Sequence, residues 1–205
     1  MKSFLKSVLF WLSIFCVSPL IIPFLLTSEK TIIISDVKRW QELLGWQNRM
    51  ILIQLLALLK EAQQFRNIYY FRLFNGNFLG KILMYLLKII YRECPYFFLD
   101  SSCNIGSGLF IQHGFSTIIM ADLGDNCWVN QQVTIGYKDK TGRPKIGNNV
   151  RITAGAKVIG NIKIGDNVTI GANAVVTKDV PDNCVVVGIP AYIIKRDGVK
   201  VREEL

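Results

Sequence analysis

The chain has 205 residues, of which 51% are hydrophobic, and its 24 Lys and Arg against 15 Asp and Glu give a formal charge of +9. This length allows one ordinary domain with a sizeable core, plus an extension. Basic and aromatic residues do not form the pattern of a nucleic-acid-binding groove, so we expect no RNA or DNA partner. The five cysteines have no CxxC spacing and the chain has one histidine, so we expect no metal site and cysteines that are reduced and buried.

Residues 1–30 are predicted to associate with a membrane. Residues 7–28 contain no charged side chain, and these 22 positions are enough to cross a bilayer core, which takes roughly 20 residues. Pro19 and Pro23 each remove a helical hydrogen bond, so a re-entrant or monotopic hairpin is as compatible as a crossing helix. Residues 1–100 hold 12 Lys and Arg against 6 Asp and Glu, and this basic excess suits an anionic membrane face.

Residues 31–100 are predicted to be α-helical. Between residues 37 and 65, and again between 78 and 91, apolar residues recur at spacings of three and four, with Lys, Arg and Glu between them. The second of these segments ends before Pro95, where a helix is expected to stop.

From residue 101 onward the helical pattern gives way to a repeat of six residues. The repeated positions are Ile105, Ile111, Thr117, Leu123, Val129 and Ile135 and, after one insertion, Ile146, Ile152, Val158, Ile164, Ile170 and Val176. Eleven of these twelve residues are aliphatic, and Gly, Asn or Asp often follow them and tolerate the positive φ of tight turns. The pattern predicts a parallel β-helix over residues 101–196, followed by a tail at 197–205.

The repeat is interrupted once. The step from Ile135 to Ile146 is eleven residues, so residues 137–145 (YKDKTGRPK) must leave the coil as a loop. Loops that interrupt a regular scaffold often carry binding or catalytic residues, although a solvated excursion is also compatible with this composition.

Residues 103–196 resemble the left-handed β-helix acyltransferases, especially the serine O-acetyltransferases and their polysaccharide-modifying relatives. The resemblance is carried by IGSGLFIQHG, NCWVNQQVTIG, RPKIG, ITAGAKVIGNIKIGDNVTIGANAVVTKDVP and VVGIPAYII. It implies a homotrimer that binds acetyl-CoA along a groove between coils, with His113 in the place of the catalytic histidine. An imidazole also suits this role chemically, because its pKa allows it to accept a hydroxyl proton near neutral pH.

The chain departs from the serine enzymes at residues that hold the amino acid. Gln112 stands where those enzymes carry aspartate, and Gly142-Arg143-Pro144 stands where they carry Arg-His-Pro. Their orienting aspartate corresponds to Phe98, so Asp100, two residues out of register, is the candidate partner of His113, with Asp122 or a backbone carbonyl as alternatives.

The resemblance also assigns candidate binding residues. Gly136, Ala154 and Ala172 match positions that line the pantetheine channel, although small residues also form turns. Lys178 and Lys195, with Arg196, are candidates for the coenzyme phosphates, although solvated surface lysines have the same pattern. The residues expected to face the acceptor are Gln112, Asn130, Gln131 and Arg143.

These departures favour an acetyl-CoA-dependent O-acetyltransferase that acts on a saccharide of a capsule, exopolysaccharide or other surface glycan, at the cytoplasmic face of the inner membrane. One alternative is a serine O-acetyltransferase of cysteine biosynthesis. The other is a non-catalytic, membrane-associated β-helix scaffold. A β-helix carbonic anhydrase is excluded, because its zinc would need several histidines.

Overall fold

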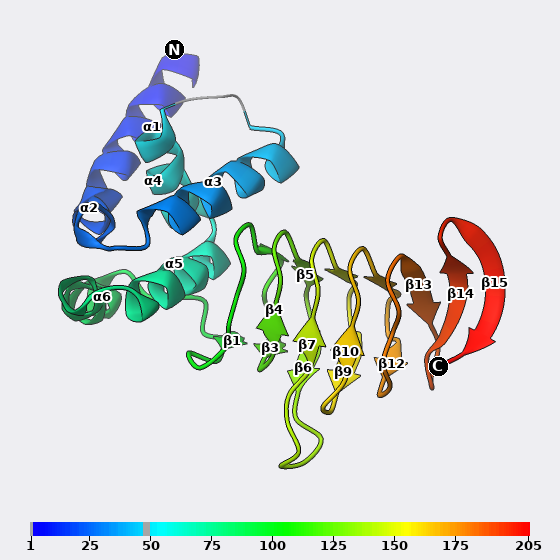
Figure 1. Ribbon diagram of the computed structural model, residues 1–205. Helices are drawn as coiled ribbons and strands as arrows, with labels where there is room; N and C mark the ends of the chain where they lie inside the picture. The colour runs from blue at the N-terminus through cyan, green and yellow to red at the C-terminus, as the bar shows by residue number, and fades with distance from the viewer. Residues whose placement is uncertain (1, 47–49) are drawn as a thin grey trace. The chain divides into compact units, whose positions relative to one another are not determined.

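The computed structural model describes residues 2–46 and 50–205, and the chain divides into two compact units, Met1–Cys94 and Pro95–Leu205 (Figure 1). The boundary lies earlier than the predicted one at residue 100. The last helix ends at Ile90, and the first strand already pairs with the β-helix, which takes residues 95–100 out of the helical region.

The first unit is built of short helices. They are α1 (Lys2–Val17), η1 (Ser18–Leu20), α2 (Ile21–Leu26), α3 (Lys30–Leu44), α4 (Ile51–Glu61), α5 (Gln63–Asn75) and α6 (Phe78–Ile90). Large apolar side chains from most of these helices form the core, and the most deeply buried include Leu20, Ile33, Trp40, Leu58, Phe65 and Tyr69. Within this core Arg72 and Asp36 form an ion pair with an N–O distance of 2.9 Å, and both side chains are almost fully buried.

The N-terminal apolar segment is helical but not straight. The helical stretch Val8–Leu26 has 19 residues and a mean hydropathy of 2.3, and by length and composition alone it could cross a membrane. It is interrupted at the 3₁₀ turn that contains Pro19, so the expectation that proline breaks the helix is confirmed. Core helices of soluble proteins also reach this length and hydropathy, so membrane association stays a prediction.

The second unit is a parallel β-helix with three sheets. Its strands are β1 (Phe97–Leu99), β2 (Phe110–Gln112), β3 (Thr117–Ile119), β4 (Asp122–Leu123), β5 (Trp128–Asn130), β6 (Thr134–Gly136), β7 (Lys145–Ile146), β8 (Arg151–Ile152), β9 (Lys157–Ile159), β10 (Lys163–Ile164), β11 (Thr169–Ile170), β12 (Val175–Val176), β13 (Cys184–Val187), β14 (Tyr192–Arg196) and β15 (Val199–Glu204). The three sheets have the orders β1-β3-β6-β9-β12, β4-β7-β10 and β2-β5-β8-β11-β13-β14-β15.

The register of the sheets confirms the six-residue repeat. Ile111 pairs with Val129, and Ile152 pairs with Ile170, so one coil takes 18 residues, which is three repeats. The repeated aliphatic side chains stack inside the prism. A second buried layer consists of small or β-branched residues four positions later: Cys127, Val133, Val150, Ala156, Val168 and Ala174.

Thr117 is the one repeat position that was assigned wrongly. The residue that pairs with Ile135 is Ile119, and Ile119 is fully buried in the stack. The turn after β2 is therefore two residues longer than the repeat requires, and the turn before β4 is two residues shorter. The coil keeps its total of 18 residues, because Ile105 still pairs with Leu123.

The inserted loop and the corners of the coils keep the remaining coils in register. Val129 pairs with Ile152, 23 residues later, so the loop adds five residues to one coil without disturbing the ladder. At one corner, Asn149, Asn167 and Asn183 adopt a left-handed backbone conformation, and their side-chain amides donate to one another from coil to coil at 3.3 and 3.0 Å. These side-chain bonds add to backbone bonds between the coils at the same corner, such as that from the N–H of Asn167 to the carbonyl of Asn148 at 2.9 Å.

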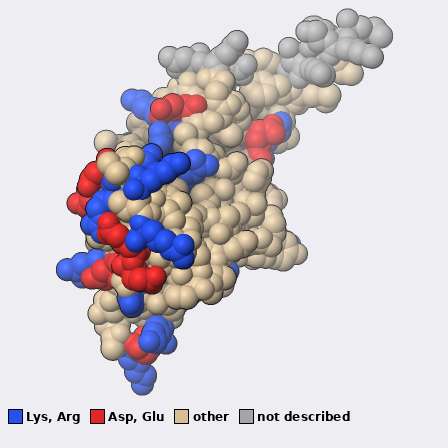
Figure 2. Space-filling model, turned by 90° about the vertical axis from the view of Figure 1, so that its right-hand side faces the viewer, with Lys and Arg blue, Asp and Glu red and all other residues tan. Residues whose placement is uncertain are grey.

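The C-terminus extends the β-helix, so the predicted tail at 197–205 is wrong. β14 and β15 form antiparallel pairs that continue the sheet from β13. On the sheet β4-β7-β10, Asp122 is half-buried and Lys145 and Lys163 are exposed. Charged side chains gather toward the left of the face shown in Figure 2.

Candidate functional site

His113 lies on the widened turn that follows β2. Its side chain is exposed and its φ is +56°, in the left-handed region, as is the φ of Ser116 at +52°. The backbone N–H of Gln132 on the next coil donates to the carbonyl of Phe115 at 3.1 Å and fixes the turn from one side. His113 therefore lies on the turn that is two residues longer than the repeat requires, and its side chain points into solvent.

Gln112, directly before His113, is held by Trp128. The indole Nε1–H of Trp128 donates to Oε1 of Gln112 at 3.1 Å. Because an indole nitrogen only donates, the Gln112 oxygen must face it, and the amide NH₂ is left as a donor on the other side. The guanidinium of Arg151 stacks on the same indole, with its carbon 4.4 Å from the ring centroid.

The neighbouring coil supplies two amide oxygens to this corner. Asn130 pairs with Gln112 in the sheet, and Gln131 follows it. Asn130 Oδ1 and Gln131 Oε1 are both inaccessible to solvent and have no hydrogen-bond partner among the described residues. Buried acceptors without partners are rare in native proteins, and each one needs an explanation such as a ligand or a neighbouring chain.

Ala154 and Ala172 lie at the same corner, on the next coils. Gly155 donates its N–H to the carbonyl of Gln131 at 3.1 Å, and Asn173 donates to the carbonyl of Ala154 at 2.9 Å. The structure therefore brings together five expected site residues on one edge of the β-helix: His113, Gln112, Gln131, Ala154 and Ala172. Their small or polar side chains leave the backbone accessible to a ligand that lies along this edge.

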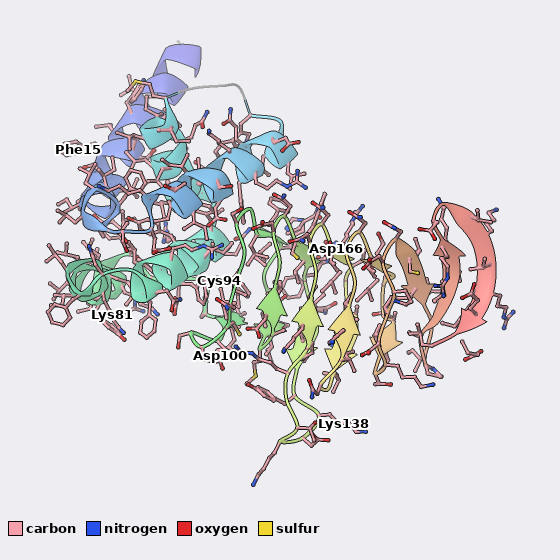
Figure 3. The ribbon with its side chains drawn as sticks, viewed as in Figure 1. Phe15, Lys81, Cys94, Asp100, Lys138 and Asp166 are labelled. Atoms are coloured by element: carbon pink, nitrogen blue, oxygen red, sulfur yellow. The ribbon has the colours of Figure 1, made fainter. Side chains whose placement is uncertain are left out.

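Asp100 and Arg143 lie at a different corner. The Asp100 carboxylate accepts the N–H of Ser102 at 2.8 Å, and the backbone and side-chain hydrogen bonds from Ser102 lower the pKa of Asp100 (Figure 3). Arg143 donates to Asp122 at 2.7 Å and to the Ser102 hydroxyl at 2.9 Å.

The length of β3 separates this second corner from the His113 turn. Tyr96 accepts from Thr117 at one end of the strand, and Asp100 donates to Ile119 at the other. Three strand residues span about 10 Å, and the Asp100 carboxylate is already held by Ser102. The role of Asp100 as the partner of His113 stays a prediction. Arg143 bonds to Asp122 and Ser102 and so fixes the end of the inserted loop. It lies away from the cluster around Gln112.

The remaining expected coenzyme residues are dispersed. Gly136 ends β6 at the start of the loop, which carries Lys138 away from the coils (Figure 3). Lys178 donates to the carbonyl of Leu205, and Lys195 is exposed on β14. Their roles toward the coenzyme stay predictions.

Trp128, Arg151 and Lys157 were not identified from the sequence. Lys157 donates to the carbonyl of Gln132 at 2.8 Å and to the Thr134 hydroxyl at 3.0 Å, so it braces the corner from the neighbouring sheet. The available signal was that all three side chains occupy outward positions of strands next to the His113 coil. That signal can be used only when the register is known.

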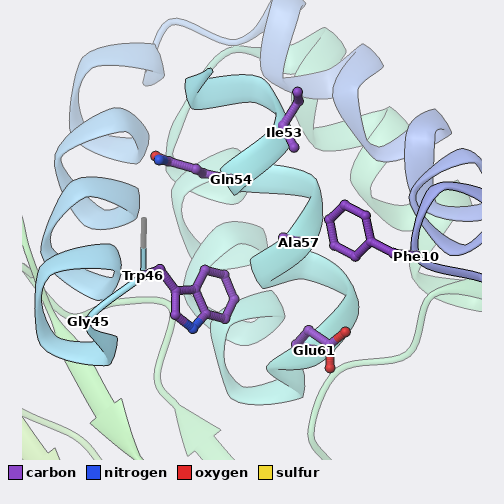
Figure 4. A pocket seen from close by; sticks show the side chains of 7 residues that line it. All are labelled: Phe10, Gly45, Trp46, Ile53, Gln54, Ala57 and Glu61. Atoms are coloured by element: carbon purple, nitrogen blue, oxygen red, sulfur yellow. The ribbon is translucent and has the colours of Figure 1, made fainter. Parts of the chain in front are cut away.

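Two hollows lie outside this corner. The helical unit has one of about 460 Å³, lined by Phe10, Trp46, Gln54 and Glu61 among others (Figure 4), and the sheet β4-β7-β10 has a shallow one beside Lys145 and Lys163. Within residues 2–46 and 50–205, no three His, Cys, Asp or Glu side chains gather in a way that could hold a metal ion.

Comparisons with known proteins place the chain beside acyltransferases. The bacterial transferase hexapeptide family (six repeats) matches residues 143–178. A serine acetyltransferase of Synechococcus elongatus is 50% identical over 103 residues, which are 48% of this chain and 42% of that protein. A serine acetyltransferase of Staphylococcus aureus is 52% identical over 103 residues, 48% of each chain. The chain thus spans less than half the length of these curated relatives.

Solved structures of serine acetyltransferases resemble a larger part of the chain. The enzyme of Neisseria gonorrhoeae has a TM-score of 0.65 and 30% identity, over 84% of this chain and 68% of that one. The enzyme of Brucella abortus in complex with coenzyme A has a TM-score of 0.64 and 28% identity, over 83% of this chain and 69% of that one.

These findings overturn the expectation of a saccharide acceptor. The relatives and the solved structures are serine acetyltransferases, so they favour the alternative that the acceptor is serine. The departures at Gln112 and Arg143 were given too much weight, because loss of a family side chain does not show that its contact with the substrate is lost.

Proposed function

The chain belongs to the left-handed β-helix acyltransferases with hexapeptide repeats, and on this basis we propose that it is an O-acetyltransferase that transfers the acetyl group of acetyl-CoA to the hydroxyl of L-serine. The similarity to serine acetyltransferases supports the acceptor. The observation that carries the proposal is the position of His113, exposed on a widened turn beside the amide side chains that are expected to face an acceptor.

The corner fits an acetyl-CoA molecule along the edge of the coils. Ala154 is half-buried and Ala172 is exposed, and both have small side chains, so a ligand can approach the backbone at these two positions. Acetyl-CoA supplies an acetyl group already activated as a thioester. The imidazole of His113 accepts the proton of the acceptor hydroxyl while the hydroxyl oxygen attacks the thioester carbonyl carbon. The C–O bond of the ester forms, the C–S bond breaks, and coenzyme A leaves as a thiol that takes the proton from the imidazolium.

Gln112 gives the serine carboxylate a partner. With its oxygen held by Trp128, its NH₂ group can donate to a carboxylate, and a hydrogen bond to a charged group is stronger than one between neutral groups. Arg151, stacked on the same indole, adds positive charge to this face. In the serine enzymes an aspartate occupies the position of Gln112, so the present chain would bind the amino acid through its carboxylate at this point.

We further propose that three copies assemble around the β-helix, as is usual for the fold.

A thiol-release assay with acetyl-CoA tests the acceptor. We expect turnover with L-serine, and a much lower rate with serine amide, which has the hydroxyl and the ammonium group but no carboxylate. Equal rates for the two compounds would contradict the role of Gln112. A lack of turnover with serine, from a protein that still binds coenzyme A in a calorimetric titration, would contradict the acceptor.

A further inference from the structure

The helical unit presents an apolar surface that its own core does not use. On α6 the exposed large side chains recur at spacings of three and four along one face: Phe78, Ile82, Tyr85, Leu86, Ile89 and Ile90. Phe78 is 78% exposed and Ile89 is 72% exposed, whereas Gly80 and Met84 on the opposite face are buried. Exposed apolar areas of this extent mark a surface that is covered by something else.

The surface continues from α6 onto α2 and α1. Asn77, at the start of α6, donates to the carbonyl of Leu26 at 2.6 Å, and Tyr91, just after its end, donates to the carbonyl of Cys16 at 2.7 Å. These bonds hold α6 alongside α2, which exposes Ile22, Leu25 and Leu26. Farther along, α1 exposes Leu9, Leu12 and Phe15, the last of which is 76% exposed and points away from the helices (Figure 3).

Charge identifies the occupant of this surface. No Asp or Glu occurs in residues 1–28 or within α6, which contains Lys81 and Lys88. Lys88 forms an ion pair with Glu93, just after the helix, at 2.6 Å. Residues 1–94 hold 12 Lys and Arg against 5 Asp and Glu, so they carry +7 of the formal charge of +9. Two copies of such a surface would repel each other, whereas an anionic lipid headgroup layer would attract it.

Helix lengths decide how the unit meets the lipid. At 1.5 Å per residue, the 16 residues of α1 extend about 24 Å, and the 13 residues of α6 extend about 20 Å. Both are shorter than a hydrocarbon core of about 30 Å, and the prolines after α1 prevent α2 from continuing it in a straight line. Short helices with one apolar face and a basic edge lie in the membrane interface.

We propose that the helical unit docks on an anionic bilayer as a monotopic module, with the exposed apolar faces of α1, α2 and α6 inserted at the headgroup level and no helix crossing. This surface is independent of the His113 corner, and it would confine an acetyltransferase to a membrane face.

Flotation of the full-length protein with phosphatidylcholine vesicles, with and without phosphatidylglycerol, tests the proposal. We expect the wild type to float with the anionic vesicles and much less with the neutral ones. Ile89→Asn and Phe78→Ser each remove one inserted side chain and should weaken binding about tenfold. Val199→Asn is the matched control, because Val199 is 65% exposed but lies on β15. All three variants should retain the wild-type rate of thiol release, which separates this test from that of the catalytic proposal.

Three outcomes would overturn the proposal. The wild type could remain in the buffer with both kinds of vesicle, or Ile89→Asn could float as well as the wild type. The third outcome combines two results: neither the wild type nor Ile89→Asn binds vesicles, and Ile89→Asn has a lower particle mass in light scattering than the wild type. This outcome would assign the surface to a second copy of the chain. A protease added outside the vesicles checks the topology, because a monotopic unit leaves tags at both ends of the chain open to cleavage.

Discussion

In the proposed reaction the side chain of His113 acts as a base, and in the structure its backbone has a φ of +56°. Asparagine tolerates this backbone conformation well, so His113→Asn removes the base and keeps the turn. We expect kcat in the thiol-release assay to fall about 10²–10⁴-fold for both His113→Asn and His113→Ala. The free energy of unfolding should stay close to the wild-type value for His113→Asn. Full activity in His113→Asn would rule out the imidazole as the base.

The hydrogen bond between Gln112 and Trp128 leads to a prediction about the KM for serine. Gln112→Glu replaces the NH₂ donor by a carboxylate of the same shape, so the KM for serine should rise about tenfold or more, with a smaller change in kcat. Trp128→Phe keeps an aromatic ring beneath Arg151 but removes the indole N–H, so the KM should rise in the same direction and by less. Initial rates at varied serine concentration measure both. An unchanged KM in Gln112→Glu would remove this residue from the acceptor site.

The sequence was enough to single out His113, because the repeat and the motif around it fix its place on a coil. It was not enough to place the turn, since Thr117, Ile118 and Ile119 are all β-branched and each fits a strand position equally well. The contact between Gln112 and Trp128 joins residues 16 apart, and it becomes visible only when the coils are in register. The bond from Ser102 to the Asp100 carboxylate was likewise not predictable, because the motif does not show which neighbours hold a carboxylate in place.

At the scale of the elements, the coils approach each other so closely at one corner that only glycine fits. A methyl group added to Gly165 would lie 2.6 Å from the backbone nitrogen of Asp182, whereas one added to Gly136 would lie 3.6 Å from Met120. Gly165→Ala should therefore lower the free energy of unfolding by about 1–3 kcal/mol, the usual cost of overpacking. Gly136→Ala should leave it nearly unchanged and weaken coenzyme A binding instead. Urea denaturation and calorimetric titration measure the two effects, and equal stability of the two variants would contradict this account of the corner.

The predicted helical segment 78–91 corresponds to α6, whereas the segment 37–65 covers parts of α3, α4 and α5, and the exposed faces of the helices were not predicted. The pattern of α6 is what a buried amphipathic helix would show, because spacing reveals that a face is apolar and not what covers it. In the β-helix each coil is covered by the next coil, which has the same sequence pattern. The repeat alone therefore predicts that its aliphatic side chains are buried.

For the molecule as a whole, the reactivity of the cysteine thiols shows whether each unit is folded. Cys103, Cys127 and Cys184 are buried in the β-helix, and burial raises the pKa of Cys103 to about 11 and that of Cys127 to about 12. Cys16 is exposed and Cys94 is half-buried, so the expectation that every cysteine is buried is wrong for these two. At pH 8 the buried thiols stay protonated, and a thiol reagent should label Cys16 first and the three β-helix cysteines only after urea unfolds that unit. Mass spectrometry of labelled peptides checks this order, and rapid labelling of Cys127 in the native protein would contradict the packing described for the coils.

The inserted loop, residues 137–145, does not have to follow the six-residue spacing of the coils. The N–H of Asp122 bonds to the carbonyl of Pro144 at 3.1 Å, and the N–H of Gly160 bonds to that of Gly136 at 2.9 Å, so the ladder closes on both sides of the excursion whatever its length. Lys138, Asp139 and Lys140 between these bonds are exposed. A foreign peptide grafted there would leave every coil in register, whereas one added residue within a coil would displace the whole stack beyond it.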